Sequence, residues 1–163
     1  MNKHKQPTEE IFLDEKLILL GVNAPDKETI IDILGNLLLK NGFVEKGFIK
    51  AVLDREKKFA TGLPTFIPVA IPHTDPVHCK KSAISFATLD TPVEFGEMGS
   101  DGKQVSVKMV FLLSLTESSN PVEWLRKLVN YFSDNTRMQS LLKAQNKKFV
   151  ANLLKSGLLL DAV

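Results

Sequence analysis

The chain has 163 residues, which fits one domain that buries roughly 70% of its unfolded surface. Its 44% hydrophobic and 25% charged residues are typical of a soluble globular protein, and a net charge of only +2 argues against nucleic acid as a partner. One cysteine excludes an internal disulfide, and the absence of a signal core or a long apolar run leads us to expect a cytoplasmic protein.

The chain is expected to begin with a tail and a short strand. Residues 1–10 are polar and predict a flexible tail, which leaves residues 11–163 as the single domain. Residues 17–20 form a short apolar run that Gly21 and Pro25 stop. A run of this length with such boundaries is more typical of a strand than of a helix.

Two helices are expected to follow this strand. From Ile30 to Leu38, apolar residues recur at the i, i+3, i+4, i+7 and i+8 positions of an amphipathic helix. Asp26 can cap the start of this helix, and Gly42 can end it. A second helix is expected from about residue 45 to residue 59, closed by a glycine. The residues expected to face inward on it are Ile49, Val52 and Leu53, and the closing glycine is Gly62.

Regularly spaced prolines exclude a helix from the next segment. Prolines recur every four residues from Pro64 to Pro76. Proline lacks an amide donor and keeps the residue before it out of the helical region. We therefore expect a loop here, apart from a short strand at residues 69–71, with His73 on the loop or at the strand end.

Three further strands are expected in the middle of the chain. Residues 82–89 alternate apolar and small polar side chains. Residues 91–95 are expected to form an edge strand, because Pro92 is tolerated there. Residues 105–115 begin with alternation and then become apolar on both faces, which is typical of a central strand.

Helices are expected to complete the chain. Asn120, Pro121 and Glu123 are typical of a helix start, and shorter helices are expected at 135–144 and 146–156. The inner face of the first of these helices is expected to comprise Val122, Leu125, Leu128, Val129 and Phe132. The element order predicts an α/β (α+β) fold with a single mixed sheet sandwiched by helices.

Four side chains that can bind metal or take part in chemistry lie close together in the sequence. They are His73, Asp75, His78 and Cys79. Zinc can use all of these ligand types, but strong zinc patterns draw ligands from two separated clusters, whereas these lie within seven residues. A zinc-binding interaction protein therefore remains only a minor alternative, and we expect no metal.

The cysteine and the first histidine can each be a nucleophile or a plain structural residue. Cys79 would need an activating base, but adjacent residues such as His78 point to the opposite face of an extended chain. Cys79 is therefore more typical of a small packed thiol. His73 is mostly uncharged at neutral pH and has one nucleophilic ring nitrogen, although a lone histidine on a loop is often only a surface residue. Phosphoryl transfer would require a hydrogen bond to its other nitrogen and donors for the phosphoryl oxygens.

An ordered set of motifs resembles the enzyme IIA proteins of the fructose–mannitol family in the bacterial sugar phosphotransferase system. The set comprises Arg55-Glu56, FATG at 59–62, FIPVAIPHTD at 66–75, His78, Ser82-Ala83-Ile84, VKMVFLL at 107–113, and Asn120-Pro121 followed by Leu125 and Leu128. The resemblance covers about residues 17–155. The RE and IPHxxxxH pattern is most similar to the galactitol-specific branch.

The resemblance implies a phosphotransferase component that works through a phosphohistidine and needs no cofactor. It implies that His73 is phosphorylated and that Arg55 stabilises the phosphate, with His78, Glu56 and Asp75 as auxiliary candidates. The donor would be HPr, the acceptor a cysteine of enzyme IIB, and the membrane component IIC would take part indirectly in the uptake of a sugar alcohol such as galactitol. Residues expected around the site for docking are Phe59, Leu63, Phe66 and Ile67.

Two departures from the family pattern leave an alternative open. Mannitol-type members have a second active-site histidine, but the corresponding segment here, SLTESSNPVEWL, has none. TFIPV also stands where a GNG-type sequence usually precedes AIPH. The same fold serves as a regulatory module that senses phosphorylation, and this alternative uses the same residues.

Overall fold

The computed structural model describes residues 11–160, and the tail predicted for residues 1–10 lies outside them. One five-stranded sheet has the order β1-β4-β5-β3-β2. Its strands are β1 (Ile18–Val22), β2 (Gly62–Leu63), β3 (Val69–Ala70), β4 (Ala83–Gly96) and β5 (Gln104–Ser114). Strand β4 pairs in parallel with β1 and antiparallel with β5, while β3 pairs in parallel with β5. The sheet is therefore mixed, as predicted.

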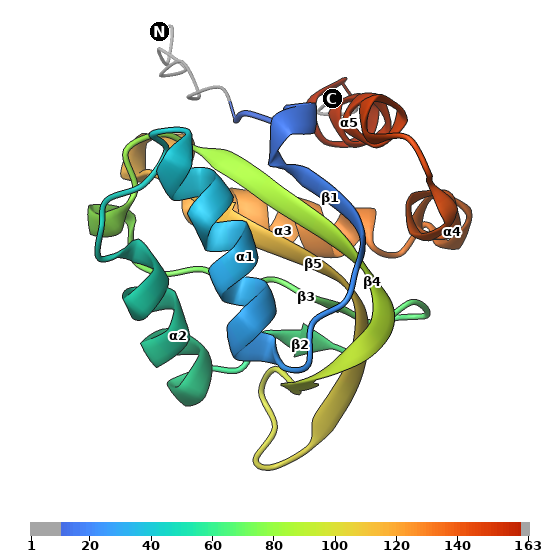
Figure 1. The fold of residues 1–163 in the computed structure, drawn as a ribbon, viewed down its shortest axis with the longest axis horizontal. Coiled ribbons are helices and arrows are strands. Elements are labelled where there is room, and N and C mark those ends of the chain that lie inside the picture. The colour runs from blue at the N-terminus through green and yellow to red at the C-terminus, as the bar shows by residue number, and fades with distance from the viewer. Residues whose placement is uncertain (1–10, 161–163) are drawn as a thin grey trace, which may run out of the picture.

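Helices cover both faces of this sheet, which confirms the predicted fold class (Figure 1). Helices α1 (Lys27–Lys40) and α2 (Phe48–Lys58) lie on one face. On the other face lie α3 (Pro121–Tyr131), α4 (Asn135–Lys143) and α5 (Lys147–Lys155). None of the helices within residues 11–160 is long and apolar enough to cross a membrane.

The pleat of the central strands divides the interior into two cores. On β4, Phe86 contributes to the core under α3, α4 and α5, while its neighbour Ala87 contributes to the core under α1 and α2. On β5, Phe111 and Leu112 divide in the same way. Successive side chains of a strand point to opposite faces, so a strand covered on both sides is apolar throughout. This explains the change in pattern that the sequence shows within β5.

The strands predicted at 82–89 and 91–95 form a single strand, β4. The pairing of β4 with β5 shifts register between Thr88 and Val93, and the exposed Pro92 lies within this irregular stretch. A proline is tolerated there because the ladder is interrupted and no amide donor is required. We predicted that Gly62 closes α2, but it belongs to the short strand β2.

The buried face of α3 differs from the predicted one. Trp124, Leu128 and Tyr131 are its buried residues, whereas Val122 and Val129 are 65% and 47% exposed. The large aromatic side chains bury more apolar area than the valines can, so they occupy the core-facing positions. The valines are left on the outer side of the helix.

Local start and stop signals were more reliable than face assignments. The Asp26 side chain accepts a hydrogen bond from the Thr29 amide at 2.8 Å and caps α1 as predicted, and Gly42 has a φ of 78° just after the helix. Asn120 is the residue that precedes α3, but its side chain makes no capping hydrogen bond, and its φ of 58° is left-handed. An asparagine tolerates this backbone conformation better than most residues.

Candidate active site around His73

His73 lies on the loop after β3, one of the two places predicted for it, and the backbone just before it is held from two sides. The Leu113 amide of β5 donates to the Pro72 carbonyl at 3.0 Å, and the Ile71 amide donates to the Thr61 carbonyl at 3.3 Å. Pro72 itself is buried. The side chain of His73 therefore projects from a loop whose preceding residues are held by hydrogen bonds.

One hydrogen bond determines the tautomer of the His73 ring. Nδ1 lies 2.7 Å from the Ile71 carbonyl oxygen. A carbonyl oxygen can only accept, so Nδ1 carries the hydrogen and donates it. In the neutral ring, Nε2 then holds the unshared electron pair. This is the arrangement that phosphoryl transfer to Nε2 requires.

The surroundings of His73 also favour the neutral ring. Burial lowers the pKa of His73 below its ordinary value of 6.5, and the nearby positive charge of Arg55 lowers it further. The hydrogen bond to Ile71 and the negative charge of Asp75 raise the pKa, but burial remains the largest cause. The ring is therefore predominantly uncharged at neutral pH.

We expect an NMR titration of His73 to have its midpoint below pH 6.5. The folded state then binds the proton less tightly than the unfolded chain, so His73 lowers the free energy of unfolding as the pH falls through 6.5. This loss of stability is complete once the pH is below the pKa of His73 in the folded state. Replacing Arg55 with glutamine should raise the midpoint, because one cause of the lowering is removed. A midpoint at or above 6.5 in the unmodified protein would contradict this account of the ring.

Arg55 lies in the last turn of α2 and has donors to spare. Its Nη1 is 3.5 Å from Oδ1 of Asp75, and its guanidinium carbon is 5.2 Å from the centroid of the Phe59 ring. The buried Nε has no hydrogen-bond partner among residues 11–160. A guanidinium has five N–H donors, of which Asp75 uses one at a long distance. The remaining donors suit an incoming group with several acceptor oxygens.

Glu56, the next residue of α2, points into the protein instead. Its side chain is buried, and its two carboxylate oxygens accept hydrogen bonds from the Thr61 amide and the Thr61 hydroxyl, each at 2.8 Å. Burial raises the pKa of the Glu56 carboxyl, while the bonds from Thr61 oppose the rise. Glu56 thus anchors the segment that leads from α2 to β2.

An apolar cavity of about 370 Å³ lies on the α3 side of His73. Its lining residues are Ile71, His73, Met98, Leu125, Arg126, Val129 and Asn130. Sequence analysis missed Met98, Arg126 and Asn130. Val129, one of the two exposed valines of α3, lines this cavity, which only the orientation of the helix reveals.

The residues expected to form a docking rim fall into two groups. Phe59 and Phe66 are 62% and 67% exposed, which is unusual for side chains of this size. Leu63 is partly buried, and Ile67 is buried in the core, so Ile67 is not available for docking. The exposed aromatic residues fit the expectation, but the core residue contradicts it.

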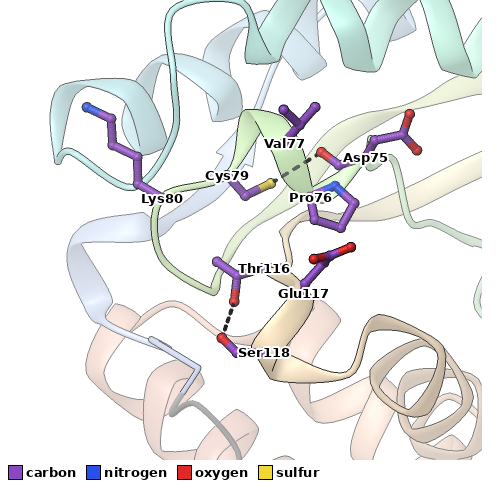
Figure 2. A pocket seen from close by; sticks show the side chains of 8 residues that line it. All are labelled: Asp75, Pro76, Val77, Cys79, Lys80, Thr116, Glu117 and Ser118. Atoms are coloured by element: carbon purple, nitrogen blue, oxygen red, sulfur yellow. Dashed lines mark hydrogen bonds between the residues drawn. The ribbon is translucent and has the colours of Figure 1, made fainter.

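Asp75, Cys79 and their neighbours line a second hollow of about 800 Å³, shown in Figure 2. The hollow is lined by Asp75, Pro76, Val77, Cys79, Lys80, Thr116, Glu117 and Ser118. The sulfur of Cys79 lies 4.0 Å from the Asp75 carbonyl oxygen, and burial raises the pKa of the thiol. A raised pKa leaves less thiolate, which favours the packed thiol over a nucleophile.

His78 ends a single turn of 3-10 helix at residues Pro76–His78. Its carbonyl accepts from the Glu45 amide at 2.9 Å, and its ring lies against Gly47, just before α2. The histidine therefore joins the loop after His73 to the helix that carries Arg55.

In the described part of the chain, no three His, Cys, Asp or Glu side chains are grouped so that they could hold a metal ion, and the zinc alternative has no ligand set there.

Comparison with known proteins extends over most of the chain. Residues 11–157 match the family described as "Phosphoenolpyruvate-dependent sugar phosphotransferase system, EIIA 2". The galactitol-specific EIIA component of Escherichia coli K12 is 27% identical over 123 residues, which are 75% of this chain and 81% of that protein. The transcriptional regulator ManR of Bacillus subtilis is 31% identical over 132 residues, which are 80% of this chain but 19% of ManR. The chain therefore spans about a fifth of that regulator's length.

A solved structure of a similar protein has the same fold. A chain in the complex of enzyme IIAMTL and phosphorylated enzyme IIBMTL from Escherichia coli matches with a TM-score of 0.75 at 25% identity. The match covers 90% of this chain and 99% of that chain.

Proposed function

Because this chain belongs to the EIIA 2 family of the phosphoenolpyruvate-dependent sugar phosphotransferase system, we propose that it carries a phosphoryl group on His73. In this proposal, His73 accepts the group from phospho-HPr and passes it to a cysteine of enzyme IIB, which supplies the membrane component IIC. The hydrogen bond from Nδ1 to the Ile71 carbonyl is the observation that supports it most directly, because it leaves Nε2 free.

The first transfer needs a positioned nucleophile and charge stabilisation. The electron pair of Nε2 attacks the phosphorus, the Nε2–P bond forms, and the bond from phosphorus to the donor breaks. Nδ1 keeps its hydrogen, so the phosphorylated ring is positively charged, and the Ile71 carbonyl is placed to stabilise that charge. The free donors of Arg55 are proposed to bind the phosphoryl oxygens, whose negative charge is spread over three atoms.

The second transfer reverses these steps at the ring. A thiolate of IIB attacks the phosphorus, the S–P bond forms, and the Nε2–P bond breaks with its electron pair returning to Nε2. The ring leaves as neutral imidazole, so no proton has to move. The held backbone before His73 and the apolar cavity beside it support docking of a partner at this side, since they combine an apolar surface with fixed geometry.

The proposal is tested by incubating the protein with phosphoenolpyruvate, enzyme I and HPr, and measuring its intact mass. We expect a gain of one acid-labile phosphoryl group that depends on HPr. Adding a galactitol-specific or a mannitol-specific IIB in parallel should then identify the acceptor. A sugar alcohol such as galactitol is our proposed substrate class, because a galactitol-specific relative and a mannitol IIA structure match at similar identity.

The similarity to ManR supports a regulatory role as the second candidate function. A phosphorylation sensor would use the same His73 and the same Arg55. Phosphorylation by HPr followed by failure to pass the group to any IIB would favour this regulatory function. Absence of phosphorylation by HPr would contradict both.

His78 and Asp75 are proposed as auxiliary residues, because one joins the site loop to α2 and the other pairs with Arg55. We expect His78→Gln to change the phosphorylation rate or the lifetime of the phosphorylated protein by at least about twofold, a barrier change of roughly 0.4 kcal/mol. Rapid-quench phosphorylation measures both quantities, and thermal unfolding serves as the control. A shifted melting temperature with an unchanged rate and lifetime would make His78 purely structural.

A further inference from the structure

A continuous chain of hydrogen bonds links the buried carboxylate of Glu56 to the ring of His73. The Glu56 carboxylate accepts the Thr61 amide at 2.8 Å. The Thr61 carbonyl accepts the Ile71 amide at 3.3 Å. The Ile71 carbonyl accepts the His73 Nδ1 hydrogen at 2.7 Å. Thr61 and Ile71 thus each donate with their amide to one partner and accept with their carbonyl from the next.

We propose that Glu56 is a positioning residue that sets the tautomer of His73 through Thr61 and Ile71. This inference rests on the proposed function for its catalytic meaning. Glu56 does not touch the phosphoryl group in this scheme. Its carboxylate holds Thr61 through the amide, Thr61 holds Ile71 through its carbonyl, and the carbonyl oxygen of Ile71 then receives the Nδ1 hydrogen.

The bonding of Glu56 explains why a carboxylate stands at this buried position. Both of its oxygens are occupied, one by the Thr61 amide and one by the Thr61 hydroxyl. A buried carboxylate without such partners would cost several kcal/mol. Hydrogen bonds to a charged acceptor are also stronger than bonds between neutral groups, so this end of the chain of bonds is firmly held.

The position of Glu56 on α2 couples the nucleophile to its stabilising cation. Arg55 and Glu56 are consecutive, so they point about 100° apart around the helix. Arg55 reaches Asp75 and the exposed Phe59, while Glu56 reaches the buried Thr61. One helix therefore holds both the guanidinium and, through Thr61 and Ile71, the imidazole.

The test measures the tautomer of His73 in the unphosphorylated protein by long-range ¹H–¹⁵N correlation of the imidazole ring. We expect the unchanged protein to show a single tautomer with the hydrogen on Nδ1. Glu56→Ala should give a mixture of tautomers. If half of the rings lose the free Nε2, the phosphorylation rate falls about twofold, and it falls further as the fraction of rings with a free Nε2 shrinks.

Two further variants separate positioning from stability. Glu56→Gln keeps an oxygen acceptor for the Thr61 amide and should restore the single tautomer. Thr61→Val removes only the hydroxyl bond and keeps the backbone bonds, so it should lower the melting temperature without changing the tautomer. If Glu56→Ala fails to fold, the probe becomes the Ile71 amide exchange rate in Glu56→Gln, which should stay as slow as in the unchanged protein.

The result that overturns the inference is a single Nδ1–H tautomer in Glu56→Ala despite a lowered melting temperature. Glu56 would then stabilise the fold and nothing more. Because the tautomer is read without any phosphoryl donor, this outcome is distinct from failure of the proposed function, which would appear as an unphosphorylated wild-type protein.

Discussion

Replacing His73 with alanine should abolish the HPr-dependent gain of a phosphoryl group. The variant lacks the ring nitrogen that carries a free electron pair beside the apolar cavity, and this nitrogen is the nucleophile of the proposed transfer. We expect the rate to fall at least about a thousandfold, as is usual when a covalent nucleophile is removed. Intact mass after incubation with phosphoenolpyruvate, enzyme I and HPr measures the loss.

A matched control separates His73 from Cys79, the thiol six residues further along the chain. Cys79→Ser should be phosphorylated at the normal rate and should pass its group to IIB, because the thiol is a packed side chain whose pKa burial raises. Phosphorylation of a folded His73→Ala variant would refute the assignment. Loss of transfer in a folded Cys79→Ser variant would show that the thiol takes part.

Replacing Arg55 with alanine should slow phosphorylation more than about tenfold, which corresponds to a loss of more than about 1.4 kcal/mol of transition-state stabilisation. The guanidinium is a cation whose charge reaches His73, and its buried Nε has no hydrogen-bond partner among residues 11–160. Rapid-quench kinetics with phospho-HPr measures the effect. Arg55→Lys should recover part of the rate, since it keeps the charge but not the planar set of donors.

The fold of the Arg55 variant should be nearly unaffected. The ion pair with Asp75 is 3.5 Å long and solvent reaches both partners, so it contributes little to stability. Lys58→Ala, which removes another cation from the last turn of the same helix, should leave the rate unchanged. Equal rates for Arg55→Ala and the unchanged protein would remove Arg55 from the site.

Much of the secondary structure follows from local signals in the sequence. Asp26 and Gly42 delimit α1 because capping and left-handed turns depend on a few neighbouring residues. The proline series excludes a helix before His73 for the same local reason. The prediction of two separate strands at 82–89 and 91–95 was wrong. Both belong to β4, which tolerates Pro92 because the pairing with β5 shifts register there. That shift belongs to the sheet and leaves no local signal.

The orientation of side chains on the helices was predicted less well. On α3 the apolar spacing includes the two valines, but the core takes Trp124 and Tyr131 instead. On α2 the spacing does not say whether Arg55 or its neighbour faces inward. Each helix offers several apolar or polar faces, and only packing against the sheet selects one of them.

The sequence by itself determined the mixed sheet with helices on both faces, the helix-free segment that carries His73, and the motifs that belong to the family. Only the tertiary structure decided which ring nitrogen of His73 is free, that Arg55 lies near it, and that Glu56 is bonded to Thr61. Arg55 precedes His73 by 18 residues along the chain. The pairing of β2 with β3 brings the end of α2 back beside the loop after β3. Such contacts depend on the closing of the intervening chain, and no local pattern of residue types records them.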